Sequence, residues 1–124
     1  MCHTAYDAII IDLYYNDAPL TRADVDMLKI KLQGGKQLIL AYRSVGEAAD
    51  YRSYWKKEWN QKQPSWICDP NPDWSGSYKV QCWMPQWKPI LYGNDKAYLD
   101  TIMAADFDGV FLDVIDAWQY FCKK

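Results

Sequence analysis

The sequence predicts a single α/β domain over residues 1–124, built from about four βα units with parallel strands. Three observations favour this class. Short continuous apolar runs alternate with segments that have helical spacing. The apolar runs are typical of strands buried on both faces, as in a parallel sheet. No repeat, low-complexity tract or linker divides the chain. The expected order of elements is therefore β-α-β-α-β-α-β-α.

The first half contains a strand, a helix and a second strand within about 35 residues. Residues 8–13 read AIIIDL and form the first expected strand. Thr21 and Asp24 precede an apolar face at helical spacing and the glycine pair 34–35 follows it, so a helix is expected there. That face consists of Val25, Leu28 and Leu32. Residues 37–42 give the second strand, which completes a βα unit with a parallel partner strand.

The second half is less regular but continues the alternation. Aromatic residues recur along residues 48–60, where a helix is expected, and proline-rich residues 64–76 are expected to form a loop. The remaining elements are a strand at 78–83, a helix at 86–91, a helix at 95–105, a strand at 107–112 and a helix at 114–121.

Composition excludes several classes of function. The chain carries 14 Lys and Arg residues against 16 Asp and Glu residues, a formal net charge of -2. It therefore lacks the basic face expected of a protein that binds nucleic acid, and we expect no nucleic-acid partner. No run of about 18 apolar residues is present, so we expect no membrane span. Residues 1–5 are neither basic nor continuously apolar, so no signal peptide is expected.

Histidine and cysteine usage argues against a metal centre. One histidine excludes a multi-histidine site, and the four cysteines form no C-x-x-C pair. We expect reduced, mostly buried thiols, and a disulfide between Cys68 and Cys82 would require an oxidising compartment. The four cysteines are Cys2, Cys68, Cys82 and Cys122. Aromatic residues make up 16% of the chain, and such residues either line a site for flat-faced ligands such as sugars or fill a core.

Polar residues follow the end of each expected strand, where α/β folds bind their ligands. Carboxylates recur at three of these four strand ends and are interleaved with aromatic side chains. This combination suits chemistry on a sugar, because carboxylates stabilise a cationic, oxocarbenium-like transition state while aromatic faces stack on the ring. The residues are Asp12 and Tyr14, then Tyr42, Ser44 and Glu47, then Trp83, and finally Asp113 and Asp116.

Each acidic residue also has a structural interpretation. Asp12 and Asp113 could cap the turns or helices that follow them, and Asp116 could interact with a helix dipole. Asp113 is the strongest functional candidate, because it directly ends an apolar strand. The structural alternative for Glu47 is an ion pair with one of two nearby arginines, Arg43 or Arg52.

Other candidates are assigned to turns or packing. Asp106 and Asp108 precede the last strand, at the end opposite to the site, and are expected to be turn residues. Among the tryptophans, Trp55, Trp59 and Trp66 are expected to pack in the core, whereas Trp83 and Trp87 could serve either purpose.

Several separate motifs, in one order, carry a resemblance to a known family. They are LAYRSVGEA at 40–48, Tyr51-Arg52, Tyr54-Trp55, Asn71-Pro72, Trp74, YKVQCW at 78–83, Trp87, and FDGVFLDVID at 107–116. Together they resemble the glycoside hydrolase family 114 group, whose type activity is endo-alpha-1,4-polygalactosaminidase, and relatives labelled as cysteinyl-tRNA-synthetase-related. The resemblance covers residue 6 to about residue 121.

The resemblance implies a TIM-type (β/α)8 barrel, usually secreted, that cleaves alpha-linked galactosamine-containing polysaccharide without a metal or organic cofactor. It implies that Asp113 is the strand-end acid and proposed nucleophile, that Gly46-Glu47 is the family's Gly-Glu element, and that Arg52 belongs to its Tyr-Arg pair. With these we expect Asp113 and Glu47 to be catalytic. The expected substrate-binding residues are Asp12, Tyr42, Arg52, Trp83 and Asp116.

Chain length adds a further expectation. A complete barrel has about 250 residues, so we expect a partial, TIM-barrel-like domain with two open sheet edges. Such edges favour association, and a homodimer through them is one expected outcome. Three functional hypotheses remain open: a glycoside hydrolase, a non-catalytic carbohydrate-binding remnant, and an inactive truncated barrel.

Overall fold

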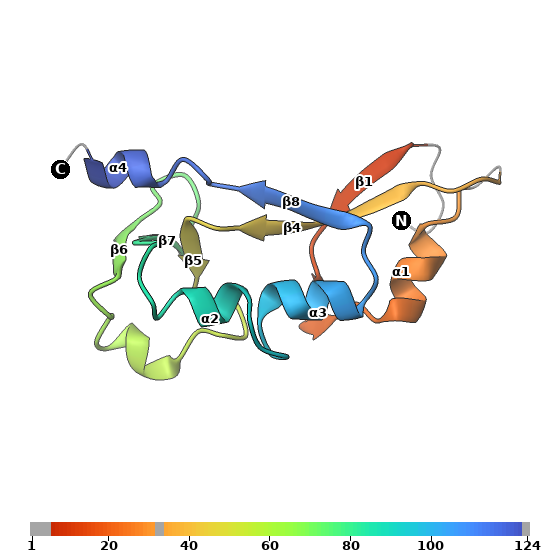
Figure 1. Ribbon diagram of the computed structural model, residues 1–124. Helices are drawn as coiled ribbons and strands as arrows, with labels where there is room; N and C mark the ends of the chain where they lie inside the picture. Colours follow the sequence, from red (N-terminus) through yellow and green to blue (C-terminus); the bar gives the residue numbers. More distant parts are fainter. Residues whose placement is uncertain (1–5, 32–33, 123–124) are drawn as a thin grey trace. The chain divides into compact units, whose positions relative to one another are not determined.

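The computed structural model describes residues 6–31 and 34–122, which form short strands and helices (Figure 1). The elements are β1 (Ala8–Ile11), β2 (Tyr14–Tyr15), β3 (Ala18–Pro19), α1 (Arg22–Leu28), β4 (Leu38–Ser44), β5 (Glu47–Ala49), η1 (Lys57–Asn60), β6 (Ile67–Pro70), β7 (Ser77–Val80), α2 (Lys88–Leu91), α3 (Tyr98–Ala104), β8 (Gly109–Asp113) and α4 (Trp118–Cys122). The chain divides into two compact units, Met1–Arg43 with Asn94–Leu112 and Ser44–Gly93 with Asp113–Lys124.

The first unit is built on a parallel sheet with the strand order β1-β4-β8. β1 pairs with β4 in parallel from Ala8 opposite Leu38 to Ile11 opposite Ala41. Side chains alternate between the two faces of a strand, and Ile39 and Ala41 of β4 are buried on the same face. Figure 1 shows α1 and α3 on one side of this sheet. The core is Ile9, Val25, Ile39 and Ala105. The predicted mixed α/β architecture with a parallel sheet is confirmed.

Helix α1 begins as the sequence predicts and ends earlier. The Thr21 side chain accepts a hydrogen bond from the Asp24 backbone N–H, and the Asp24 carboxylate accepts from the Thr21 backbone N–H, which completes a capping box. The helix ends at Leu28, and Ile30 and Lys36 then form an isolated antiparallel bridge. The predicted helix was therefore too long at its carboxyl end, where Leu32 lies outside the described residues.

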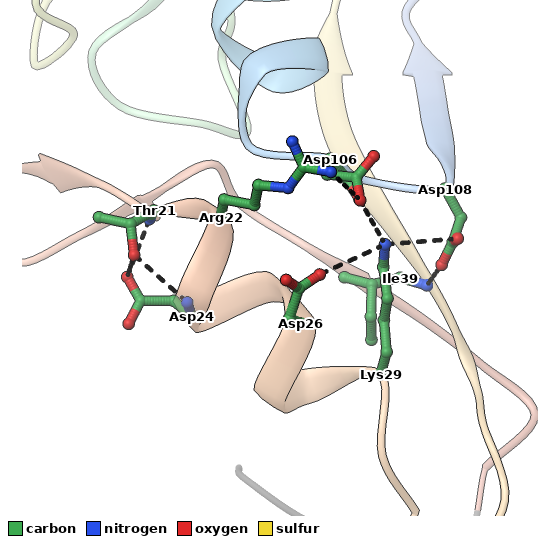
Figure 2. A network of polar contacts seen from close by, with 8 residues as sticks. All are labelled: Thr21, Arg22, Asp24, Asp26, Lys29, Ile39, Asp106 and Asp108. Atoms are coloured by element: carbon green, nitrogen blue, oxygen red, sulfur yellow. Dashed lines mark hydrogen bonds and ion pairs between the residues drawn. The ribbon is translucent and has the colours of Figure 1, made fainter.

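A cluster of charged side chains ties α1 to the turn before β8 (Figure 2). The ammonium group of Lys29 lies 3.5 Å from a carboxylate oxygen of Asp106 and 3.7 Å from one of Asp108. The second carboxylate oxygen of Asp108 accepts a hydrogen bond of 2.8 Å from the Ile39 backbone N–H in β4. Asp106 adopts a φ of 63°, as a turn residue after a helix does. The two aspartates thus are turn residues, and they also bind α1 and β4.

β2 and β3 form an antiparallel hairpin that was not predicted from the sequence. Asn16 and Asp17 connect the two short strands, and both have positive φ angles, of 49° and 64°. Two consecutive residues of this kind form the type I′ turn that suits a tight hairpin, and Asn and Asp tolerate this conformation best after Gly.

The second unit corrects two predictions. The predicted third strand does not join the parallel sheet, because β7 lies between β5 and β6 in an antiparallel sheet. The helix predicted over residues 48–60 is absent: β5 occupies its start, and η1 is a single 3-10 turn near its end. Ala48 and Ala49 instead pair with Tyr78 and Ser77, and all three residues of β5 are buried. Tertiary pairing therefore overrides the helical propensity of alanine.

The core of the second unit is aromatic. Trp59, Trp66 and Trp87 are buried together with Ala48, Ile67 and Val80. The indole N–H of Trp87, the most deeply buried of the three, donates a hydrogen bond of 2.7 Å to the Val45 carbonyl. This partner allows a polar indole to be buried completely. Trp59, Trp66 and Trp87 are thus packing residues, while Trp83 is about half exposed.

The remaining elements agree approximately with the predictions. The helices α2 and α3 and the strand β8 begin two or three residues later than predicted and end within one residue of the predicted segments, whereas α4 begins four residues later. The predicted loop at 64–76 contains β6. No helix in the described part of the chain is long and apolar enough to cross a membrane.

Candidate functional site

Asp113 is the last residue of β8, and its side chain is exposed. One carboxylate oxygen accepts a hydrogen bond of 2.8 Å from the Val114 backbone N–H, and the Asp113 carbonyl accepts one of 3.0 Å from the Val45 backbone N–H. Val114 adopts a φ of 57°, which is rare for a β-branched residue. Conformations of this kind persist only where the surroundings enforce them, and they are frequent at functional sites.

Three other predicted site residues belong to the second unit, and each has a contact of its own. Asp116 is exposed and its carbonyl accepts a hydrogen bond from the Gln119 backbone N–H, just before α4. Trp83 makes an edge-to-face contact with Phe121, with ring centroids 5.2 Å apart. The guanidinium carbon of Arg52 lies 5.3 Å from the centroid of the Tyr51 ring.

Glu47, by contrast, is buried and surrounded by hydrogen-bond donors. Its carboxylate accepts hydrogen bonds from the Ser77 hydroxyl at 2.7 Å and from the Asn71 side-chain amide at 3.0 and 3.2 Å. The Lys79 ammonium group lies 3.5 Å from the same carboxylate. Lys79 is therefore the cation that the structure places at Glu47, where the sequence suggested Arg43 or Arg52. Three side-chain donors satisfy the carboxylate of a residue that is only 8% exposed.

Two predicted site residues belong to the first unit. Asp12 follows β1, and its carboxylate accepts a hydrogen bond of 2.9 Å from the Tyr14 backbone N–H, a local turn contact. Tyr42 of β4 stacks on Phe111 of β8, with ring centroids 6.3 Å apart. Arg43 points to the opposite, buried face, where its guanidinium carbon lies 3.9 Å from the centroid of the Tyr98 ring. This cation–π contact gives the buried arginine an aromatic partner.

Sequence reasoning missed the residues that surround Glu47. Asn71 directly follows β6, Ser77 begins β7, and Lys79 of β7 stands directly opposite Glu47 in the antiparallel ladder. The alternation of polar and apolar residues over 77–80 was the available signal, but it becomes informative only when β5 is recognised as a strand.

Among residues 6–31 and 34–122, no group of three or more His, Cys, Asp and Glu side chains could hold a metal ion. Among the described residues no disulfide joins Cys68 to Cys82, and Cys2 lies outside the described residues.

Comparison with known proteins places this arrangement in a family. The model of glycoside-hydrolase family GH114 matches residues 2–123. The chain belongs to family GH114. The family match spans both units, and so includes β8 with Asp113 and β5 with Glu47.

Three uncharacterised proteins are similar to this chain in sequence. An uncharacterised protein of Methanocaldococcus jannaschii is 43% identical over 94 residues, which are 76% of this chain and 26% of that protein. Uncharacterised proteins of Deinococcus radiodurans and Thermotoga maritima are 38% and 31% identical over 94% and 98% of this chain, and the matches cover 36% of each relative. This GH114 chain therefore spans about a third of the length of these relatives, or less.

Two solved structures share the fold of this GH114 chain. The crystal structure of Aspergillus fumigatus Ega3 in complex with galactosamine matches with a TM-score of 0.66 at 19% identity, over 93% of this chain and 39% of that one. The glycoside hydrolase domain of PelA from Pseudomonas aeruginosa matches with a TM-score of 0.62 at 23% identity, over 93% and 40% of the two chains.

Proposed function

We propose that this chain is part of a glycoside hydrolase that acts on alpha-linked galactosamine-containing polysaccharide through carboxylates at the ends of its strands. The observation that carries the proposal is Asp113, an exposed carboxylate at the carboxyl end of a strand in a GH114 chain. The likeness to a protein solved with galactosamine supports the choice of sugar.

We also propose that the chain forms a single domain and part of a (β/α)8 barrel. In such barrels the loops after the carboxyl ends of the strands carry the active site. The antiparallel sheet β5-β7-β6 and the helix α2 occur in the chain between β4 and α3. On this proposal, residues 45–93 form an extended loop after β4, and this loop has the position of an active-site loop.

Asp113 would act on the positive charge that develops as the glycosidic bond breaks. As a nucleophile, one of its oxygens bonds to the anomeric carbon while that carbon's bond to the glycosidic oxygen breaks. The departing oxygen takes a proton from a general acid, and water then hydrolyses the glycosyl ester. As a charge stabiliser, the same carboxylate stays unbonded and a water molecule attacks instead. Both roles need a carboxylate that is held at a fixed position. The hydrogen bond from the Val114 backbone N–H restrains the Asp113 carboxylate in this way.

We propose Glu47 as the general acid that acts together with Asp113. A general acid must donate its own proton, and the carboxylate of Glu47 accepts hydrogen bonds from Asn71 and Ser77 and lies beside Lys79. These contacts equally favour a second role, in which Glu47 fixes the surrounding loop. The two roles predict different kinetics.

The sugar site would be shaped by residues that offer rings and hydrogen-bonding groups. Aromatic rings can cover one face of a pyranose, and charged groups can bind its hydroxyl or amino substituents. The residues proposed for this purpose are Asp12, Tyr42, Arg52, Trp83 and Asp116.

The test is the release of reducing ends from an alpha-1,4-linked galactosamine polymer by the chain. We expect release by the unmodified chain, loss by at least about a hundredfold in Asp113→Asn, and unchanged release in Asp95→Asn, an exposed aspartate of the other unit. Release that survives Asp113→Asn would exclude Asp113 as the nucleophile or charge stabiliser.

A non-catalytic carbohydrate-binding protein is the second candidate. It is favoured by exposed aromatic side chains, including Trp74 and Trp83 at 63% and 48% exposure. Retention of the chain on the polymer without release of reducing ends would support this candidate.

We also propose that the chain forms a homodimer through the open sheet edges. Sedimentation at the assay concentration checks it, and a monomer would exclude a site shared by two copies.

A further inference from the structure

Two solvent-exposed aromatic side chains of the second unit lie next to one another. Tyr51 is 57% exposed and Trp74 is 63% exposed. The Trp74 indole N–H donates a hydrogen bond of 3.2 Å to the Tyr51 hydroxyl oxygen. The Arg52 guanidinium group lies over the Tyr51 ring. We refer to Tyr51, Arg52 and Trp74 as the aromatic platform.

The turn that carries Trp74 is attached at both ends to the buried carboxylate of Glu47. Asn71 at its start and Ser77 at its end both donate hydrogen bonds to that carboxylate. The side-chain oxygen of Asn71 also accepts a hydrogen bond of 2.9 Å from the Asp73 backbone N–H. One amide group therefore links the buried carboxylate to the residue before Trp74, which fixes the turn from inside.

The Tyr51 side of the platform is fixed by the same turn. The Asp50 backbone N–H donates a hydrogen bond of 2.9 Å to the Gly76 carbonyl. Gly76 has a φ of 83°, and an added Cβ would lie 2.7 Å from a carboxylate oxygen of Asp50. Glycine is thus required both by the backbone conformation and by the close approach of Asp50.

Folding gains little from this arrangement, because large aromatic surfaces contribute to stability only when they leave water. A rigid turn that keeps a tryptophan and a tyrosine exposed is instead suited to binding. Because the side chains are already ordered, less conformational entropy is lost when a ligand binds. Flat rings beside a guanidinium group match a sugar, which has a C–H face and a rim of polar substituents.

We propose that the aromatic platform is a binding subsite for a sugar ring of the polysaccharide, and that Glu47 is its positioning residue. This inference rests on the proposed function for the identity of the polymer. It assigns a binding role to Trp74 and Tyr51, which are separate from the reacting carboxylate Asp113 in sequence and in secondary structure.

Binding is measured without turnover by titrating an alpha-1,4-linked galactosamine oligosaccharide into the Asp113→Asn chain in a calorimeter. Removing a central aromatic contact commonly lowers affinity by tenfold or more. We expect about a tenfold weaker Kd when Trp74→Ala or Tyr51→Ala is added. Trp118→Ala is the matched control, because Trp118 is a 51% exposed tryptophan of the same unit outside the platform, and its Kd should change less than about twofold.

The outcomes separate this inference from the proposed function. The binding role of the platform would be contradicted if Trp74→Ala left the oligosaccharide affinity unchanged. It would also be contradicted if the Asp113→Asn chain did not bind the oligosaccharide at all. Neither result would contradict the proposed hydrolysis, which is measured separately with the unmodified chain. Conversely, a chain that binds through Trp74 without releasing reducing ends supports the platform and contradicts the proposed hydrolase.

Glu47→Gln tests the positioning role, because glutamine keeps the shape of the side chain while removing its charge. If Glu47 positions the platform, we expect a weaker Kd and a higher KM, with a larger change in KM than in kcat. Asn71→Ala, which breaks the link and leaves Glu47 in place, should weaken the Kd in the same direction. Loss of kcat with an unchanged Kd would overturn the positioning role and identify Glu47 as the general acid. Circular dichroism confirms that each variant is folded.

Discussion

Gly46 and Ala117 pack so closely that a Cβ added to Gly46 would overlap the Cβ of Ala117 and the carbonyl oxygen of Val114. The same stretch of chain donates the Val45 backbone N–H to the Asp113 carbonyl. The connection between β4 and β5 therefore lies directly against the segment that carries Asp113.

Gly46→Ala is expected to destabilise the protein by about 1–3 kcal/mol, because neither the Val114 backbone nor Ala117 can move away without shifting the segment after β8. Urea unfolding followed by tryptophan fluorescence measures the change. Gly109→Ala is the control: its Cβ would meet only a side-chain methyl group of Leu40, at 3.1 Å, so a smaller loss is expected. Equal stability of Gly46→Ala and the parent chain would contradict the close packing.

Val114 provides a test of backbone strain beside Asp113. Val114→Gly and Val114→Ala both remove the branched side chain, but only glycine adopts a φ of 57° without a steric cost. We expect the glycine variant to be more stable than the alanine variant by about 1 kcal/mol. Thermal unfolding of the two variants measures the difference, and a more stable alanine variant would argue against the positive φ.

Lys29 ties the end of α1 to the turn before β8 through one ammonium group. This group donates a hydrogen bond of 2.5 Å to the Asp106 carbonyl and lies near the carboxylates of Asp26, Asp106 and Asp108. Lys29→Met should cost about 1–3 kcal/mol, because these acceptors lose their cation in a region where the lysine side chain is only 19% exposed. Arg22→Met serves for comparison. The Arg22 side chain is 69% exposed, so the loss of its 3.4 Å ion pair with Asp106 should cost less than about 1 kcal/mol. Chemical denaturation ranks the two variants, and an equal cost would contradict a central role for Lys29.

The capping box at α1 makes a prediction about pH. Hydrogen bonds from the backbone and side chain of Thr21 hold the pKa of Asp24 below its ordinary value. Because the folded-state pKa is the lower one, the contribution to stability is present above the unfolded-state pKa of about 3.9. It is lost as the pH falls through the folded-state pKa. NMR titration of the Asp24 carboxyl carbon should show the lowered pKa, and Thr21→Ala should return it towards the ordinary value. An unchanged pKa in Thr21→Ala would exclude the cap as its cause.

The local parts of the fold follow from the sequence. The apolar runs of β1, β4 and β8 predict buried strands, and the Thr21–Asp24 pair predicts the start of α1, because each signal lies in residues that are close together in the chain. The position of Asp113 at the end of β8 and the family follow in the same way, from an apolar strand and from the order of short motifs.

Tertiary structure decided the second unit. Ala48 and Ala49 of β5 were predicted to be helical, and only pairing with β7, about 30 residues later in the chain, makes them part of a strand. That pairing places Lys79 opposite Glu47 and brings Asn71 and Ser77 to the same carboxylate, which converts a candidate strand-end acid into a buried acceptor. Burial and cross-strand partners depend on distant segments, so no local pattern could have predicted them.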